Sequence, residues 1–386
     1  MTRLAGGTST GSKRPEALYG AAAPSDLPIR MIRSYDAQVV AEDGRTYLDF
    51  IAALGAVSLG YAHPAVVAAA QDAVARGAVG SLAPRDEEAL AARLVETIPW
   101  LEQVRFLKTG AEAVAAAVRL ARAATGRDLV LGAGYHGWLD LTSDAPGVPA
   151  AVQRGFRRLP FNDSEAARHL IRESGNALAA VVIEPVVDGA PSVEWLRVLR
   201  DETAQVGAVL IYDEIKTGFR VALGGAAERW GVVPDLAVYG KALGNGFPIA
   251  AVGGVGRVMD QVGRTWISST LATEYVSLAA ARAAVDESVR VGLPAILGRL
   301  GQRLYDGLAA IATRHPGLVA GVRGIPEMCY LAWHDPAVGA EVAIEAARRG
   351  LLFKRTAYNF VTLAHAEADI DRCLTVVAAI LDERAS

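Results

Sequence analysis

Two polar residues that follow apolar segments are suited to acid–base and covalent chemistry. Asp213 follows a predicted strand at 208–212, and Lys241 lies in a glycine-rich turn after a predicted strand at 236–239. Open α/β sheets bind ligands at the carboxyl ends of their strands, where both residues are expected. A ligand can approach a lysine between glycines closely, and partial burial lowers the pKa of its amine toward nucleophilic use. The carboxylate could serve as a base, a metal ligand or the partner of a protonated ring nitrogen.

A third feature is the turn Lys108-Thr109-Gly110-Ala111, which follows a predicted strand at 104–107 and opens an alanine-rich helix. Small residues at a helix N-terminus expose backbone N–H groups that suit a phosphate, although an ordinary strand–helix turn has the same pattern. A reactive amine, a carboxylate and a phosphate cup together are what pyridoxal phosphate requires. No acidic or histidine cluster with metal-ligand spacing lies near Asp213, so we predict no metal site.

An alternative nucleotide site is suggested by the stretch GAGYHG at 132–137, which matches G-x-G-x-x-G after a predicted strand. A dinucleotide site also needs a helix that opens at the last glycine and an acidic residue about 20 positions later. The chain instead continues into the turn-rich stretch LDLTSDAPGVP. The basic Arg157 and Arg158 stand about where the acidic residue would be needed. The nicotinamide or flavin interpretation is therefore the weaker one.

Composition excludes several classes of function. The chain has 386 residues, 52% of them hydrophobic, and 39 Lys and Arg against 42 Asp and Glu give a net charge of −3. No excess positive charge is available for a polyanion, so we expect neither nucleic acid nor a membrane as a partner. The apolar runs are shorter than the roughly 20 residues of a membrane helix. Two distant cysteines and the lack of a signal-like start predict a soluble cytoplasmic protein.

Strands and helices alternate from about residue 100 onward. The predicted strands lie at 104–107, 128–131, 180–183, 208–212, 236–239 and 249–252. Several are continuous runs of Val, Ile, Leu and Ala, which is typical of strands buried on both faces of a mainly parallel sheet. Asp43-Gly44 predicts a hairpin near the N-terminus, and the remainder after about residue 295 is predicted to be α+β, with strands at 330–333 and 360–363 and a last helix at 369–382.

Eight motifs together resemble class III pyridoxal-phosphate aminotransferases, and most of all the glutamate-1-semialdehyde aminomutase branch, and the resemblance runs from about Ala37 to Asp369. They are YLDFIAALGAVSLGYAHP, LKTGAEA, LARAATGR, YHGW, VIEPV, YDEIKTGFRVALGG, PDLAVYGKALGNGFPIAAVGG and STLATEYVSLAAA, in this order. The resemblance implies the α/β fold of fold-type I transferases. A seven-stranded, mainly parallel sheet would lie in a large cofactor domain at 49–294, and a smaller α+β domain would combine 1–48 and 295–386.

The resemblance also assigns catalytic and phosphate-binding roles. Lys241 would form the Schiff base with the cofactor and shuttle the proton, and Asp213 would keep the pyridine nitrogen protonated. Thr109, Gly110 and Ala111 would cup the phosphate, with Ala111 in place of the usual Thr or Ser. That replacement removes one hydroxyl contact.

Further residues would surround the cofactor ring or come from a second subunit. By resemblance, Tyr135 would stack on one face of the ring and Ile215 would pack on the other, with His136 and Glu184 close by. Thr270 matches a threonine that in this family reaches the phosphate of the neighbouring subunit. A homodimer with shared active sites is thereby implied.

Two departures from the aminomutase pattern concern its substrate. The aminomutase holds the substrate carboxylate with an N-terminal arginine and pairs that arginine with a C-terminal glutamate. The matching stretch LYGAAAPSDLP contains no arginine, and Ala357 stands about where the glutamate is expected. The segment after Trp138, a long gate in the aminomutase, is also short here. A shorter gate should leave a wider entrance to the active site.

These features predict an aminotransferase that moves an amino group from a donor to a carbonyl acceptor other than glutamate-1-semialdehyde, such as a sugar, a cyclitol or another specialised metabolite. Arg30, Lys354 and Arg355 are fallback contacts for a substrate anion, or plain surface charges. An isomerase, either an aminomutase or an amino-acid racemase or epimerase, would use the same Lys241 and Asp213. A regulatory protein that binds the cofactor is a further alternative, without a basic patch to support it.

Overall fold

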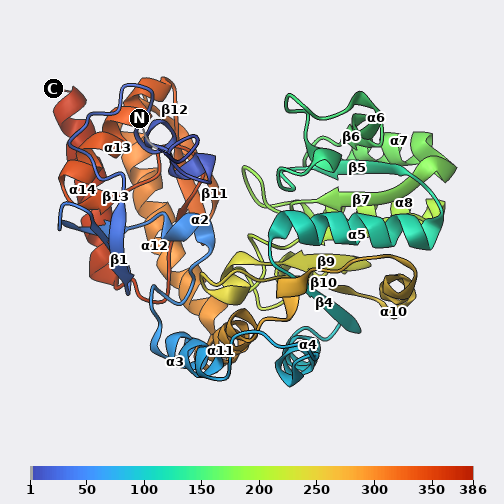
Figure 1. The fold of residues 1–386 in the computed structure, drawn as a ribbon. Coiled ribbons are helices and arrows are strands. Elements are labelled where there is room, and N and C mark those ends of the chain that lie inside the picture. Colours follow the sequence, from blue (N-terminus) through green and yellow to red (C-terminus); the bar gives the residue numbers. More distant parts are fainter. Residues whose placement is uncertain (1–2, 386) are drawn as a thin grey trace. The chain divides into compact units, whose positions relative to one another are not determined.

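The computed structural model describes residues 3–385, which form two compact units (Figure 1). The large unit is Pro64–Pro294, and the small unit combines the residues up to His63 with those from Ala295 onward. The sequence predicts residues 49–63 in the large domain, whereas the structure places them in the small unit. The reason is pairing with segments of the small unit, because Asp49 pairs with Leu352 and Tyr61 forms an isolated bridge with Asp36.

A seven-stranded sheet forms the centre of the large unit, with the strand order β4-β10-β9-β8-β7-β5-β6. The strands are β4 (Gln103–Leu107), β5 (Leu129–Ala133), β6 (Phe156–Arg158), β7 (Leu178–Ile183), β8 (Val209–Asp213), β9 (Leu236–Tyr239) and β10 (Ala250–Gly254). Only β10 runs antiparallel to its neighbours, so the carboxyl ends of the other six meet at one edge. The predicted mainly parallel α/β fold is confirmed.

Helices cover both faces of this sheet, as the ribbon in Figure 1 shows. Helices α5 (Gly110–Thr125) and α10 (Gly256–Met259) pack on one face, and α4 (Arg85–Thr97), α7 (Ser164–Ser174), α8 (Val193–Val206) and α11 (Tyr275–Val291) pack on the other. Val181 of β7 joins one hydrophobic core and Val182 joins the other. Alternate residues of a strand point to opposite faces, which explains why the buried strands are apolar throughout.

Helix α5 is stabilised at both ends by its own sequence. The Thr109 side chain accepts a hydrogen bond from the Glu112 N–H, and the Glu112 carboxylate accepts one from the Thr109 N–H, so the two form a capping box. Gly126 ends the helix in the left-handed conformation with φ 70°. The first turn of α5 is thereby fixed directly after β4. The large unit also contains α3 (Pro64–Ala75), α6 (Ala150–Gln153) and α9 (Ala226–Trp230).

Within residues 3–385, the small unit has two sheets, three long α-helices and two short ones. Strands β1 (Met31–Tyr35), β2 (Gln38–Ala41), β3 (Thr46–Asp49) and β13 (Leu351–Leu352) form one sheet, and β11 (Val319–Ile325), β12 (Met328–Trp333) and β14 (Asn359–Phe360) form the other. The helices are α1 (Pro15–Tyr19), α2 (Ala52–Gly55), α12 (Leu293–Arg314), α13 (Pro336–Arg348) and α14 (Glu367–Ala385). Strand β14 is shorter than the predicted strand at 360–363, because only two of its residues pair with β12. None of the helices in residues 3–385 has the length and apolar character needed to cross a membrane.

Candidate active site

The predicted site residues of the large unit lie at the carboxyl edge of its sheet. Tyr135 and His136 follow β5, Glu184 follows β7, Asp213 ends β8 and Lys241 follows β9. These four strands are consecutive neighbours in the sheet. Residues that are up to 106 positions apart in the chain are therefore neighbours here.

Asp213 and His136 form a buried pair at this edge. The His136 Nδ1 lies 2.9 Å from the Asp213 Oδ2, and their side chains are 1% and 4% exposed. The other carboxylate oxygen, Oδ1, accepts a hydrogen bond from the Ile215 N–H at 3.2 Å. A carboxylate has about four acceptor positions, so Asp213 keeps capacity for a further donor. The His136 Nε2 is buried and has no hydrogen-bond partner among residues 3–385.

Lys241 has an unusual backbone and a perturbed amine. Its φ of 47° lies in the left-handed region, which costs energy for a residue with a side chain and is often found at functional sites. Burial of the amine is the largest cause that lowers its pKa, and the positive charges of Lys216 and Arg220 lower it further. The carboxylates of Glu184 and Asp213 act in the opposite direction. A lowered pKa provides more of the neutral amine, which is the nucleophilic form.

The turn before α5 lies against the segment that follows β8. A Cβ on Gly110 would come within 2.5 Å of the Ile215 Cδ1, so only glycine permits this approach. Ile215 also lies beside Gly240, because a Cβ on Gly240 would be 3.6 Å from the Ile215 Cγ2. The Thr109 side chain already accepts from the Glu112 N–H, but the N–H groups of Gly110 and Ala111 have no partners within the helix and are suited to an anion. The structure thus brings Gly110, Ile215 and the backbone beside Lys241 together.

Glu184 positions the segment after β5. Its Oε2 accepts a hydrogen bond from the Tyr135 N–H at 2.8 Å. Gly134 has φ 101°, and a Cβ there would lie 2.7 Å from the Glu184 Cβ and Oε2, so glycine allows the contact. The Tyr135 side chain is 69% exposed and available to a ring, as its predicted stacking role requires.

Two residues near this site, Lys216 and Glu214, are given no role in the cofactor site by the sequence. Lys216 lies 2.9 Å from Glu184, Nζ to Oε1, and Glu214 is fully buried. Both stand within the quoted motif YDEIKTGFRVALGG. Their position directly after a buried strand was the available signal.

Thr270 is exposed and begins the short helix η6 (Thr270–Thr273). No hydrogen bond or ion pair among the described residues joins its side chain to the residues above. Its role at the phosphate of a neighbouring subunit remains a prediction. The residues around it include the strongly exposed Trp266, at 86%, and Leu271, at 55%.

The residues present fit pyridoxal phosphate. Asp213 can accept a hydrogen bond from a ring N–H, and His136 provides an unpartnered buried nitrogen. Helix α5 offers the N–H groups of Gly110 and Ala111, and Lys241 provides the amine. The stretch 132–137 leads into a loop and not into a helix, so it lacks the element on which a dinucleotide phosphate would rest. The described residues contain no cluster of three or more potential metal ligands.

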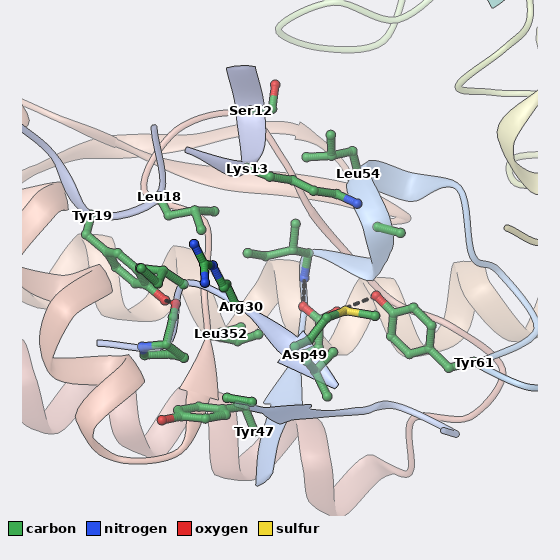
Figure 2. Close-up of a pocket in the computed structure, with 17 residues that line it drawn as sticks. Ser12, Lys13, Leu18, Tyr19, Arg30, Tyr47, Asp49, Leu54, Tyr61 and Leu352 are labelled. Carbon is green, nitrogen blue, oxygen red and sulfur yellow. Dashed lines mark hydrogen bonds between the residues drawn. The ribbon is translucent and has the colours of Figure 1, made fainter. Parts of the chain in front are cut away.

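The small unit holds a separate cavity of about 320 Å³ that includes Arg30 among its lining residues (Figure 2). Figure 2 shows that Lys13 and Asp49 line the same cavity. The Asp49 Oδ2 accepts a hydrogen bond from the Tyr61 hydroxyl at 2.6 Å. Arg30 is exposed and lies 3.9 Å from Glu42.

The two other predicted anion contacts are also in the small unit. Lys354 is buried, and this burial lowers the pKa of its amine. Arg355 donates to the backbone oxygen of Glu16 at 3.1 Å.

Comparisons with known proteins show the family and the fold of this chain. The model of the family "Aminotransferase class-III" matches residues 19–381. A glutamate-1-semialdehyde 2,1-aminomutase from Thermomicrobium roseum is 37% identical over 94% of this chain and 92% of its own. An omega-transaminase from Sphaerobacter thermophilus has a TM-score of 0.87 at 29% identity, over 96% of this chain and 93% of its own. The FumI protein of Sphingopyxis sp. MTA144, solved with pyridoxal phosphate, has a TM-score of 0.89 at 26% identity, over 93% of this chain and 90% of its own.

The family match spans most of the chain. The cofactor of this protein is pyridoxal phosphate, and its fold is that of the PLP-dependent transaminases. The chain belongs to the class-III aminotransferase family.

Proposed function

We propose that the enzyme is an aminotransferase that moves an amino group from an amino donor to a separate carbonyl acceptor. The observation that carries the proposal is the lack of both partners of the aminomutase's carboxylate clamp. The stretch 18–28 contains no arginine, and Ala357, in the loop between β13 and β14, is exposed. An acceptor without an α-carboxylate, such as an oxidised sugar or a cyclitol, needs neither partner.

The residues of the sheet edge can perform the proton steps of such a reaction. When bound, pyridoxal phosphate supplies an electron sink that stabilises negative charge on the substrate carbon next to nitrogen. The Lys241 Nζ, whose pKa is lowered by burial, can accept the proton of that carbon and return it to a neighbouring atom. The Asp213 carboxylate favours a protonated ring nitrogen through its charge, and His136 holds that carboxylate in place at 2.9 Å.

A homodimer is part of this proposal. Large apolar side chains are strongly exposed on the large unit, and they include Leu82 at 85%, Trp138 at 75% and Trp266 at 86%. Exposed apolar residues of this size are typical of subunit interfaces. Thr270 lies beside the exposed Leu271, so a subunit that covers this surface would approach Thr270.

An isomerase remains the second candidate, and it is favoured by the name of the 37% identical relative from Thermomicrobium roseum. The same Lys241 and Asp213 would serve a reaction that returns the amino group to the molecule from which it came. The two proposals differ in one respect that can be measured. A transaminase needs two substrates, whereas an isomerase needs one.

The test follows an isotope-labelled amino group. Purified enzyme with its cofactor is incubated with ¹⁵N-labelled amino donors, alone and with a panel of aldehyde and ketone acceptors. We expect ¹⁵N in the acceptor only when both substrates are present, and no transfer in Lys241→Ala. An aminated or epimerised product that forms from a single substrate would instead establish the isomerase.

A further inference from the structure

We propose that Lys216 is a positioning residue of the active site, which acts through Glu184 on the backbone of Tyr135 and through its charge on the amine of Lys241. The four residues follow β5, β7, β8 and β9, which are consecutive strands of the sheet. The proposal depends on the pyridoxal phosphate site. It holds for a transaminase and for an isomerase alike.

The geometric part of the argument is a chain of two polar contacts. The Lys216 Nζ lies 2.9 Å from the Glu184 Oε1, and the Glu184 Oε2 accepts from the Tyr135 N–H at 2.8 Å. The Lys216 and Glu184 side chains are 10% and 14% exposed. Removal of one partner from a nearly buried ion pair leaves the other charge uncompensated, unlike the loss of a solvent-exposed pair. Lys216 therefore determines where Glu184 lies, and with it the residue expected to contact the cofactor ring.

The electrostatic part concerns the groups that act on Lys241. Glu184 after β7 and Asp213 at the end of β8 raise the pKa of its amine, while Lys216 and Arg220 after β8 lower it. His136, which follows β5, is hydrogen-bonded to Asp213. Loss of Lys216 removes a positive charge and also leaves the Glu184 carboxylate unpaired. Both changes have the same sign, and each raises the pKa of Lys241.

A purely structural ion pair would give a different result. Its loss would lower the free energy of unfolding without a change in the reactivity of Lys241. Arg200 provides a control, because its Nη2 lies 3.0 Å from the Asp235 Oδ2 in a pair whose side chains are 25% and 6% exposed, although Asp235 also pairs with Arg257. Asp235 directly precedes β9, at the opposite edge of the sheet from Lys241.

The experiment measures the amine directly. The full chain, freed of cofactor, is acetylated at a series of pH values, and the modification of the Lys241 peptide is quantified by mass spectrometry. We expect Lys216→Met to raise the midpoint by about one pH unit, a typical effect of one nearby charge. Lys216→Arg should restore the wild-type midpoint, and Arg200→Met should leave it unchanged. Glu184→Gln should lower the midpoint, because it removes a negative charge, and this variant tests the proposal even if Lys216→Met does not fold.

A second measurement tests the contact with Tyr135. The rate at which pyridoxal phosphate leaves the enzyme should rise in Lys216→Met by about tenfold, because the Glu184 carboxylate that holds the Tyr135 N–H loses its ion-pair partner. An unchanged Lys241 midpoint in Lys216→Met, or in Glu184→Gln where only that variant folds, overturns the proposal. A shift that Lys216→Arg fails to reverse overturns it as well.

Discussion

At the scale of single residues, the site depends on a carboxylate held at the end of a strand. Asp213 is 4% exposed and is bonded to His136 at 2.9 Å and to the Ile215 N–H at 3.2 Å. These contacts fix its direction but do not use all of its acceptor positions. The charge of Asp213, and not only its shape, is what the proposed chemistry requires.

We therefore expect Asp213→Asn to reduce kcat by about 100-fold. Loss of the opposite charge lowers the pKa of the ring nitrogen by about 1–3, so less of that nitrogen is protonated. Asparagine keeps the size of the side chain and can still accept from the Ile215 N–H. Steady-state kinetics checks the loss, and circular dichroism serves as the control for folding. Wild-type turnover in this variant would contradict the role of Asp213.

At the scale of elements, one buried carboxylate joins β8 to α9. Glu214 is fully buried and accepts hydrogen bonds from the Thr217 hydroxyl and from the N–H groups of Ala226, at 2.8 Å, and Ala227, at 3.0 Å. Burial raises the pKa of Glu214 to about 7, against the opposing effect of these donors. The segment between β8 and α9, which includes Lys216, is thereby tied to the sheet.

This raised pKa predicts a pH dependence of stability. Between about pH 4.5 and 7 an unfolded chain loses the Glu214 proton while the folded chain keeps it. The contribution of Glu214 to the free energy of unfolding therefore falls as pH rises. The loss amounts to at most about 3 kcal/mol across this window. Glu214→Gln cannot titrate, so the stability of wild type relative to this variant should decline from pH 4.5 to 7.

Urea denaturation of both proteins at several pH values measures that difference. The loss of one acceptor in Glu214→Gln lowers stability by an amount that does not depend on pH, so only the slope is diagnostic. Parallel curves for the two proteins would show that Glu214 has no raised pKa.

At the scale of the whole molecule, the proposed dimer would complete each site with a residue of the other subunit. Thr270 is exposed, and the large unit presents exposed apolar side chains near it, such as Leu271 at 55%. A site that combines Lys241 of one subunit with Thr270 of the other can be tested by complementation.

Lys241→Ala and Thr270→Ala are prepared separately, dissociated, mixed and allowed to reassociate. In a mixed dimer one site contains both changes, and the other contains the native Lys241 and the native Thr270. We expect Thr270→Ala to bind pyridoxal phosphate about tenfold more weakly, as loss of one charge-assisted hydrogen bond predicts. The mixed dimers should regain one site of native affinity, and light scattering gives the subunit count. If both residues of a site came from the same subunit, mixing would restore no site that binds with native affinity and carries Lys241.

Much of this protein can be predicted from its sequence, because local rules are sufficient for it. Apolar runs such as LAAVVI predict strands buried on both faces, and the turn of small residues after the strand at 104–107 predicts the start of α5. The motifs around Asp213 and Lys241 also predict the family and its cofactor. Each of these inferences rests on residues that are close together in the chain.

The tertiary structure decides the contacts that join distant segments. His136 meets Asp213, and Glu184 meets both Tyr135 and Lys216, because β5, β7 and β8 are neighbours in the sheet. Strand order follows from the packing of helices on both faces, and no local pattern encodes it. The residues 49–63 joined the small unit for the same reason, since pairing across the chain outweighs position along it. The sequence thus determines which residues can do chemistry, and strand order decides which of them meet.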